Sequence, residues 1–210
     1  MKIMVLPGDG IGPEIMDATL KAVRALDTKY GLGLDLQTRE IGLTSLATRG
    51  STLPDDVVEE CRLADGTILG PVDTYAYPPL SEGGVNPSGH MRKTLDLYAN
   101  IRPSKTYDGV PAMAKKMDMV VVRENTEDLY AGIEFEADDP KTKELITQLK
   151  DLSKQPIASD SGISIKPISI SATERVVRFA CDYALKNGRS KVTAIHKANI
   201  MKFTDGLFME

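Results

Sequence analysis

Apolar positions in the first part of the chain alternate between short unbroken runs and helical stripes. Residues 2–6 form an almost wholly apolar run, which is typical of a strand covered on both faces. A glycine-rich turn over residues 7–13 follows and leads into an apolar stripe with helical spacing, made by Ile15, Ala18, Ala22 and Leu26. We therefore expect a strand, a tight turn and an amphipathic helix that Gly31 ends.

The same alternation continues to about residue 70. Residues 34–38 alternate like a half-buried strand, Pro54 begins a short helix, and residues 67–69 form another buried strand. The order strand, helix, strand, helix, strand predicts the α/β class with a parallel or mixed sheet.

The later segments are more varied. Residues 71–90 are rich in proline and glycine and predict a long loop. A buried strand is predicted at 119–122, a helix at 140–153, antiparallel-style strand segments at 163–170, a helix from a capping box at 171–174 to Gly188, and a strand at 191–195.

Composition narrows the functional classes. The 210 residues are 41% hydrophobic and 27% charged, with a net charge of −4 and no dense basic run, so we expect no nucleic-acid partner. No apolar run approaches the roughly 20 residues of a membrane helix, and residues 2–6 are too short for a secretory signal. Cys61 and Cys181 lie in apolar helical patterns, which favours buried free thiols in a cytoplasmic protein over a disulfide.

The glycine-rich turn does not match a nucleotide-binding fingerprint. Pro13 stands where the third glycine of G-x-G-x-x-G belongs, so the segment indicates a tight strand-to-helix turn, and no P-loop motif is present. His90 and His196 have no spaced Cys or His partners and predict no metal cluster.

Five side chains carry the candidate chemistry: Arg92, Arg102, Arg123, Tyr130 and Lys197. Converging guanidinium groups bind carboxylates through paired charge-assisted hydrogen bonds, and a Tyr and a Lys in a pocket that shifts their pKa values can transfer protons. The pattern indicates a small dicarboxylic or tricarboxylic acid as substrate. The alternatives are that Arg92 and Arg102 are solvated helix arginines, that Arg123 forms an ion pair with its neighbouring glutamates, and that Tyr130 only packs. Against the first alternative, Pro103 fixes Arg102 at a predicted helix end.

Motifs at residues 7–14, 92–103, 123–132 and 196–202 resemble the β-decarboxylating dehydrogenases, the family of isocitrate, 3-isopropylmalate, homoisocitrate and tartrate dehydrogenases. The resemblance covers essentially the whole chain in order. It implies an α/β open sheet of the isocitrate/isopropylmalate dehydrogenase type with a dimer-forming arm. It also implies oxidation and decarboxylation of a (2R)-hydroxy acid, with NAD or NADP and Mg²⁺ or Mn²⁺ as cofactors.

The resemblance also implies roles for single residues. The substrate carboxylates would be held by the three arginines, Arg92, Arg102 and Arg123. Tyr130 would protonate the enolate left by decarboxylation, Lys197 from the second subunit of a homodimer would assist transfer of the hydroxyl proton, and Asn199 would lie near the nicotinamide.

Two stretches, 124–134 and 162–167, resemble the isocitrate enzymes most. Asn86 and Ser88 are polar where isopropylmalate enzymes carry leucines, although isocitrate enzymes present this polar pair in the opposite order. A substrate with a polar substituent is favoured, most of all isocitrate, which would give 2-oxoglutarate. The alternatives are 3-isopropylmalate, homoisocitrate, malate and tartrate.

Domain boundaries follow from the same resemblance. Residues 1–97 would form the first half of a large domain, 98–127 and 173–210 a small domain, and 128–172 the dimer arm. Members of the family continue past Glu210 with the metal-binding aspartates and the adenosine-binding loop. An alternative is therefore a non-catalytic amino-terminal fragment that binds carboxylic acids without metal or nucleotide.

Overall fold

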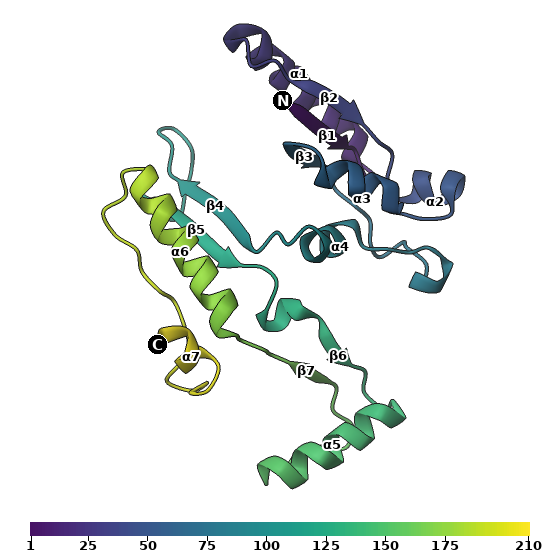
Figure 1. Cartoon of the computed structure of the whole chain (residues 1–210), viewed down its shortest axis with the longest axis vertical. Helices are drawn as coiled ribbons and strands as arrows, with labels where there is room; N and C mark the ends of the chain where they lie inside the picture. The colour runs from purple at the N-terminus through teal and green to yellow at the C-terminus, as the bar shows by residue number, and fades with distance from the viewer. The chain divides into compact units, whose positions relative to one another are not determined.

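The computed structural model describes residues 1–210, which divide into two compact units, Met1–Asp96 and Leu97–Glu210 (Figure 1). Each unit has its own sheet or sheets. None of the helices combines the length and apolar character needed to cross a membrane.

The first unit contains a parallel three-stranded sheet in the order β2–β1–β3, which confirms the predicted α/β class. Its elements are, in chain order, β1 (Lys2–Leu6), α1 (Gly12–Tyr30), β2 (Asp35–Thr38), α2 (Leu43–Arg49), α3 (Asp55–Arg62), β3 (Gly66–Leu69), the 3-10 turn η1 (Leu80–Glu82) and α4 (Pro87–Thr94).

Strand β1 is the centre of this unit because it is paired on both edges and covered on both faces. Met4 and Leu6 belong to a buried cluster with residues of α3 and α4. Val5 points the other way, as the period of a strand requires, and packs against Met16 and Leu20 of α1. The unbroken apolar run at residues 2–6 thus has the doubly covered position that its composition predicts.

The glycine-rich turn is a tight strand-to-helix connection, as predicted. Gly8 has a φ of 80°, and a Cβ atom there would collide with the backbone carbonyl of Pro71. Only glycine allows this close approach. The loop predicted over 71–90 is shorter than expected, because Asn86 caps the amino end of α4 and Pro87 is its first residue.

The second unit consists of two antiparallel pairs of strands and three helices. Its elements are β4 (Ala99–Lys105), β5 (Asp118–Glu124), the 3-10 turn η2 (Asp128–Ala131), β6 (Ile133–Phe135), α5 (Pro140–Ser153), β7 (Ile163–Ile165), α6 (Ile170–Lys186) and α7 (Asp205–Met209). β4 pairs with β5 and β6 with β7, and α6 lies along β5 (Figure 1). The predicted helix at 140–153 and the antiparallel pairing near 163–165 are confirmed.

Two predictions about strands were wrong. Arg102 lies inside strand β4 and not at a helix end, because residues 99–105 hydrogen-bond along the whole length of β5. Residues 191–195 form no strand, since nothing pairs with them, and Ile195 is 84% exposed. Strand formation requires a partner, and local sequence pattern cannot supply one.

Two local predictions in α6 also need correction. The helix is capped by Ser169 and not by Ser171, because the Ser169 hydroxyl accepts a hydrogen bond from the Ala172 N–H at 3.1 Å. Gly188 follows the helix with a φ of 62° and ends it as predicted. Cys61 is a buried free thiol, but Cys181 is exposed on α6, so its predicted burial was wrong.

Candidate functional site

Arg102 and Arg123 lie on one face of the β4–β5 ribbon. Asn100 pairs with Arg123, and Arg102 pairs with Val121, so the strand period places all four side chains on the same side. The Arg102 Nε donates a hydrogen bond to the Asn100 Oδ1 at 3.2 Å. The pairing register therefore makes the two guanidinium groups diagonal neighbours on this face, with an amide beside them.

Arg123 stacks on Tyr130. The guanidinium carbon lies 3.7 Å from the centre of the Tyr130 ring, within the range of a cation–π contact. The Nη2 atom of Arg123 is buried and has no hydrogen-bond partner. An unsatisfied charged donor is costly to bury, so this atom is suited to receive an anionic acceptor.

The glutamates after Arg123 are occupied by other donors. The Glu124 carboxylate accepts from the Thr126 N–H at 2.8 Å and from the Thr126 hydroxyl at 2.6 Å. Glu127 accepts from the Ser169 N–H at 2.7 Å and from its hydroxyl at 2.6 Å. These carboxylates shape the turn after β5 and tie it to the start of α6, and they leave Nη2 of Arg123 unsatisfied.

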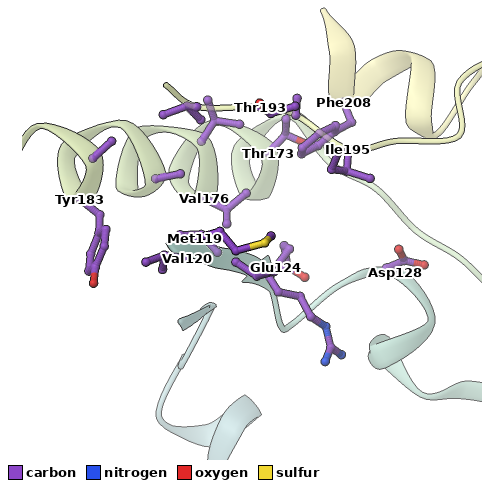
Figure 2. Close-up of a pocket in the computed structure, with 18 of the residues that line it drawn as sticks. Met119, Val120, Glu124, Asp128, Thr173, Val176, Tyr183, Thr193, Ile195 and Phe208 are labelled. Atoms are coloured by element: carbon purple, nitrogen blue, oxygen red, sulfur yellow. The ribbon is translucent and has the colours of Figure 1, made fainter. Parts of the chain in front are cut away.

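A cavity of about 760 Å³ adjoins Arg123 and Tyr130 within the second unit. It lies among β5, α6, the segment 191–195 and α7, as Figure 2 shows. Much of its wall is apolar, with contributions from Val120, Val176, Ile195 and Phe208. An apolar cavity with a few charged groups at its edge is the usual form of a small-molecule site.

Helix α4 of the first unit brings three predicted substrate-binding residues together. The Arg92 Nη2 donates to the Ser88 hydroxyl at 3.0 Å, and its Nε donates to the Ser88 carbonyl at 3.1 Å. Asn86 Oδ1 accepts from the Gly89 N–H at 3.1 Å and caps the helix. The spacing of four residues places Ser88 and Arg92 on one helical face.

Lys197 and Asn199 lie in a segment that follows residues 191–195. Their side chains are exposed, and neither lines the cavity that includes Arg123 and Tyr130. The backbone N–H of Lys197 donates to the Asp205 Oδ1 at 2.7 Å. The position of Lys197 therefore depends on Asp205, a residue for which the sequence predicts no functional contact.

A cluster of charged side chains around Lys166 was not predicted from the sequence. Its ammonium nitrogen lies 2.7 Å from the Asp205 Oδ2 and 3.7 Å from the Asp128 Oδ2. The hydrogen bond from Lys166 lowers the pKa of Asp205, and the same bond raises the pKa of Lys166. No local signal predicts this pair, because its members are separated by 39 residues.

The first unit has a buried polar centre of its own at Asp9. Its carboxylate accepts from the Leu43 N–H at 2.7 Å, from the Asp73 N–H at 3.2 Å and from the Tyr77 hydroxyl. Burial, together with the adjacent Asp9 carboxylate, raises the pKa of Tyr77. Asp9 thereby joins the glycine-rich turn to α2 and to the loop after β3.

The described residues contain no group of three or more His, Cys, Asp or Glu side chains arranged to hold a metal ion. The side chains of residues 1–210 by themselves do not fit a complete site for Mg²⁺ or Mn²⁺.

Comparison with known proteins places the chain in a family. A family model described as isocitrate/isopropylmalate dehydrogenase matches residues 2–210, and the chain belongs to this family. The "Isocitrate dehydrogenase [NADP]" of Archaeoglobus fulgidus is 39% identical over 206 residues, which are 97% of this chain and 49% of that protein. The protein of the same description from Haloferax volcanii is 40% identical over 216 residues, covering 99% of this chain and 50% of the relative.

Solved structures agree with this assignment. The crystal structure of isocitrate dehydrogenase from Methylococcus capsulatus superposes with a TM-score of 0.77 at 35% identity, and the match covers 99% of this chain and 54% of that one. This likeness confirms the predicted fold type. The chain spans about half the length of the curated relatives it matches.

Proposed function

We propose that this chain carries the acid-binding part of an NADP-dependent enzyme that oxidises and decarboxylates isocitrate to 2-oxoglutarate. The observation that carries the proposal is the arginine face of the β4–β5 ribbon, where a buried guanidinium nitrogen of Arg123 has no partner beside Tyr130. Family membership and relatives named isocitrate dehydrogenase [NADP] support it further.

In this proposal the arginines bind the carboxylates of the substrate. Arg102 and Arg123 present two guanidinium groups from neighbouring strands, and each can bind a carboxylate through two parallel hydrogen bonds. Arg92, with Ser88 beside it on α4 and Asn86 at the N-cap of the helix, is the third proposed contact. Guanidinium groups on the carboxylates would orient the acid, and fixing its orientation removes much of the entropic cost of the reaction.

The proton transfers are assigned to Lys197 and Tyr130. The substrate hydroxyl gives up its proton with assistance from Lys197 while the hydride leaves the same carbon. Loss of CO₂ then leaves an enolate, which takes a proton from the Tyr130 hydroxyl. The contact of Tyr130 with Arg123 supports this role, because it holds the phenol beside a carboxylate-binding group.

NADP⁺ would accept the hydride when bound, with Asn199 as the proposed contact near the nicotinamide. The exposed position of Asn199 leaves its amide accessible to such a ligand. NAD⁺ is the alternative acceptor. The side chains of residues 1–210 do not form a divalent-metal site by themselves.

We also propose that residues 128–172 are the arm of a homodimer. Residues 98–127 and 173–210 would form the small domain, and residues 1–97 the first half of the large domain. The arm contains the isolated β6–β7 pair, and two-stranded sheets are at best marginally stable alone. Ile133 and Ile165, which face each other in this pair, are 40% and 39% exposed. This apolar, exposed pair suits a surface that a second copy covers.

Measurements of substrate affinity test the proposed carboxylate-binding arginines. Isocitrate, malate, tartrate and isopropylmalate would be titrated by calorimetry into the native protein that contains this chain. We expect isocitrate to bind best, and Arg123→Ala or Arg102→Ala to weaken its binding by about 2–5 kcal/mol, because a substrate carboxylate loses its partner. Arg49→Ala, which removes an exposed arginine paired with Asp56, is the matched control.

The titration has clear contrary outcomes. Unchanged affinity in both arginine variants would remove Arg102 and Arg123 from the site, and preference for isopropylmalate would overturn the assignment based on Asn86 and Ser88. Binding of isocitrate without any reduction of NADP⁺ or NAD⁺ in the presence of Mg²⁺ would favour the non-catalytic acid-binding alternative.

Paired variants test the proton transfers and the shared site. Lys197→Met should suppress hydride transfer and Tyr130→Phe should slow the later step, each by roughly 100- to 10,000-fold. Mixed dimers of the two inactive variants should regain activity if each site uses Tyr130 of one copy and Lys197 of the other. Mixtures that stay inactive after verified subunit exchange would refute the shared site.

A further inference from the structure

Lys166 lies between two carboxylates that come from different parts of the second unit. Asp205 stands at the start of α7 and Asp128 at the start of η2, and the Lys166 nitrogen is 2.7 Å and 3.7 Å from their respective Oδ2 atoms. The side chains of Lys166 and Asp205 are only 19% and 12% exposed. Ion pairs with so little exposure are far less screened than surface pairs.

Each carboxylate is connected to a residue of the proposed proton transfers. Asp205 uses its second oxygen, Oδ1, to accept the N–H of Lys197 at 2.7 Å. Asp128 precedes Tyr130 by two residues in the same 3-10 turn. Lys166 therefore connects, through one ammonium group, the segment of Lys197 and the turn of Tyr130.

The backbone around Lys166 reinforces the second connection. The N–H of Asp128 donates to the carbonyl of Pro167 at 3.0 Å. Asp128 has a φ of 62°, a left-handed conformation that costs free energy for a residue other than glycine. The contacts with residues 166 and 167 supply the restraint that holds Asp128 in this conformation.

We propose that Lys166 and Asp205 are positioning residues for the reaction: their ion pair holds the Lys197 segment and the Tyr130 turn in their working places. The inference rests on the proposed roles of Lys197 and Tyr130 in proton transfer. Neither Lys166 nor Asp205 takes part in proton transfer itself. A purely structural pair would change stability when removed, whereas a positioning pair also changes turnover without changing substrate affinity.

Amide hydrogen exchange tests the geometry independently of activity. The Lys197 N–H should be protected in the native protein, and Lys166→Met should accelerate its exchange by roughly tenfold or more as Asp205 loses its charged partner. Lys143→Met is the matched control. Lys143 also pairs with an aspartate of the second unit, Asp138, but both of these side chains are more than half exposed. This variant should leave the Lys197 N–H unchanged.

Kinetics of isocitrate oxidation in the same proteins test the role. Lys166→Met should lower kcat by roughly 10- to 100-fold with little change in KM for isocitrate, because misplaced catalytic groups slow the reaction while the arginine receptor is intact. Lys166→Arg keeps the charge and should recover most of kcat. If Lys166→Met fails to fold, Asp205→Asn serves instead, because it retains the oxygen that accepts the Lys197 N–H.

The outcomes separate the inference from the function on which it rests. Wild-type exchange and wild-type kcat in both Lys166→Met and Asp205→Asn would overturn the positioning role and leave the proposed function standing. A native protein that oxidises no hydroxy acid would overturn the proposed function, and the positioning role in catalysis with it. Equal losses of kcat and of Lys197 N–H protection in Lys166→Met and Lys143→Met would also contradict a specific role of the Lys166–Asp205 contact.

Discussion

The two units bury their central strands very differently. β1 of the first unit has Met4, Val5 and Leu6 fully buried, with a paired strand on each edge and helices on both faces. β5 of the second unit pairs with one strand only, and its Val121 is 40% exposed. A similar run of apolar residues thus produces a closed core in one unit and an open wall of a cavity in the other.

This contrast indicates which interactions stabilise each unit. Removal of apolar surface from water stabilises the first unit, at about 25 cal/mol per Å². The second unit relies more on polar contacts between distant segments, such as Glu127 with Ser169 and Lys166 with Asp205. Arg123 and Tyr130 belong to this less buried unit.

The largest expected effect comes from the core of the first unit. Leu6→Ala should lower the free energy of unfolding by about 2–5 kcal/mol, because it leaves a cavity in a fully packed cluster. Val121→Ala, at an exposed site of β5, should cost about 0.5–1 kcal/mol. Urea denaturation measures both. Equal losses at the two positions would contradict the contrast between the units.

Asp9 provides a polar test within the well-buried unit. Asp9→Asn should cost about 1.5–3 kcal/mol, since a charged acceptor of two backbone N–H groups and the Tyr77 hydroxyl is lost. Amide exchange of Leu43 and Asp73 should rise in this variant. Protection of both amides at the wild-type level would show that the apolar core alone orders these loops.

The pH dependence of stability tests the polar contact in the second unit. Asp205 has its pKa lowered from the ordinary 3.8, so its contribution is present above about pH 4 and is lost as pH falls through the lowered pKa. Lys166 has its pKa raised from 10.5, so its contribution is present below about pH 10.5 and is lost as pH rises through the raised pKa. Thermal unfolding would measure the free energy of unfolding of wild type and Lys166→Met across this pH range. The two values should differ most between the two pKa values, by about 1–3 kcal/mol. A constant difference that persists into strong acid would contradict the assignment.

The smallest effect is expected at an exposed ion pair. Lys143→Met removes a contact of 3.2 Å with Asp138 and should change stability by about 0.5 kcal/mol or less, because solvent screens the pair. Calorimetric melting would measure it. A loss as large as that of Lys166→Met would mean that burial does not distinguish the two lysines.

Elements with strong local signals could be predicted from the sequence. The apolar run of β1, the glycine turn before α1, the helix over 140–153 and the stop at Gly188 all have the structures that their residues indicate. Turn geometry, helix termination and apolar periodicity depend on neighbours within a few residues. The arginine, tyrosine and lysine motifs also indicated the family, which the comparisons confirm.

Contacts between distant segments could not be predicted from the sequence. Arg102 belongs to a strand because β5 lies beside it, and residues 191–195 are not a strand because no partner does. Lys166 contacts Asp205 across 39 residues of sequence. Strand pairing and ion pairing require groups that the fold brings together. Residue patterns therefore specify the local elements, whereas contacts between distant elements form only in the folded chain.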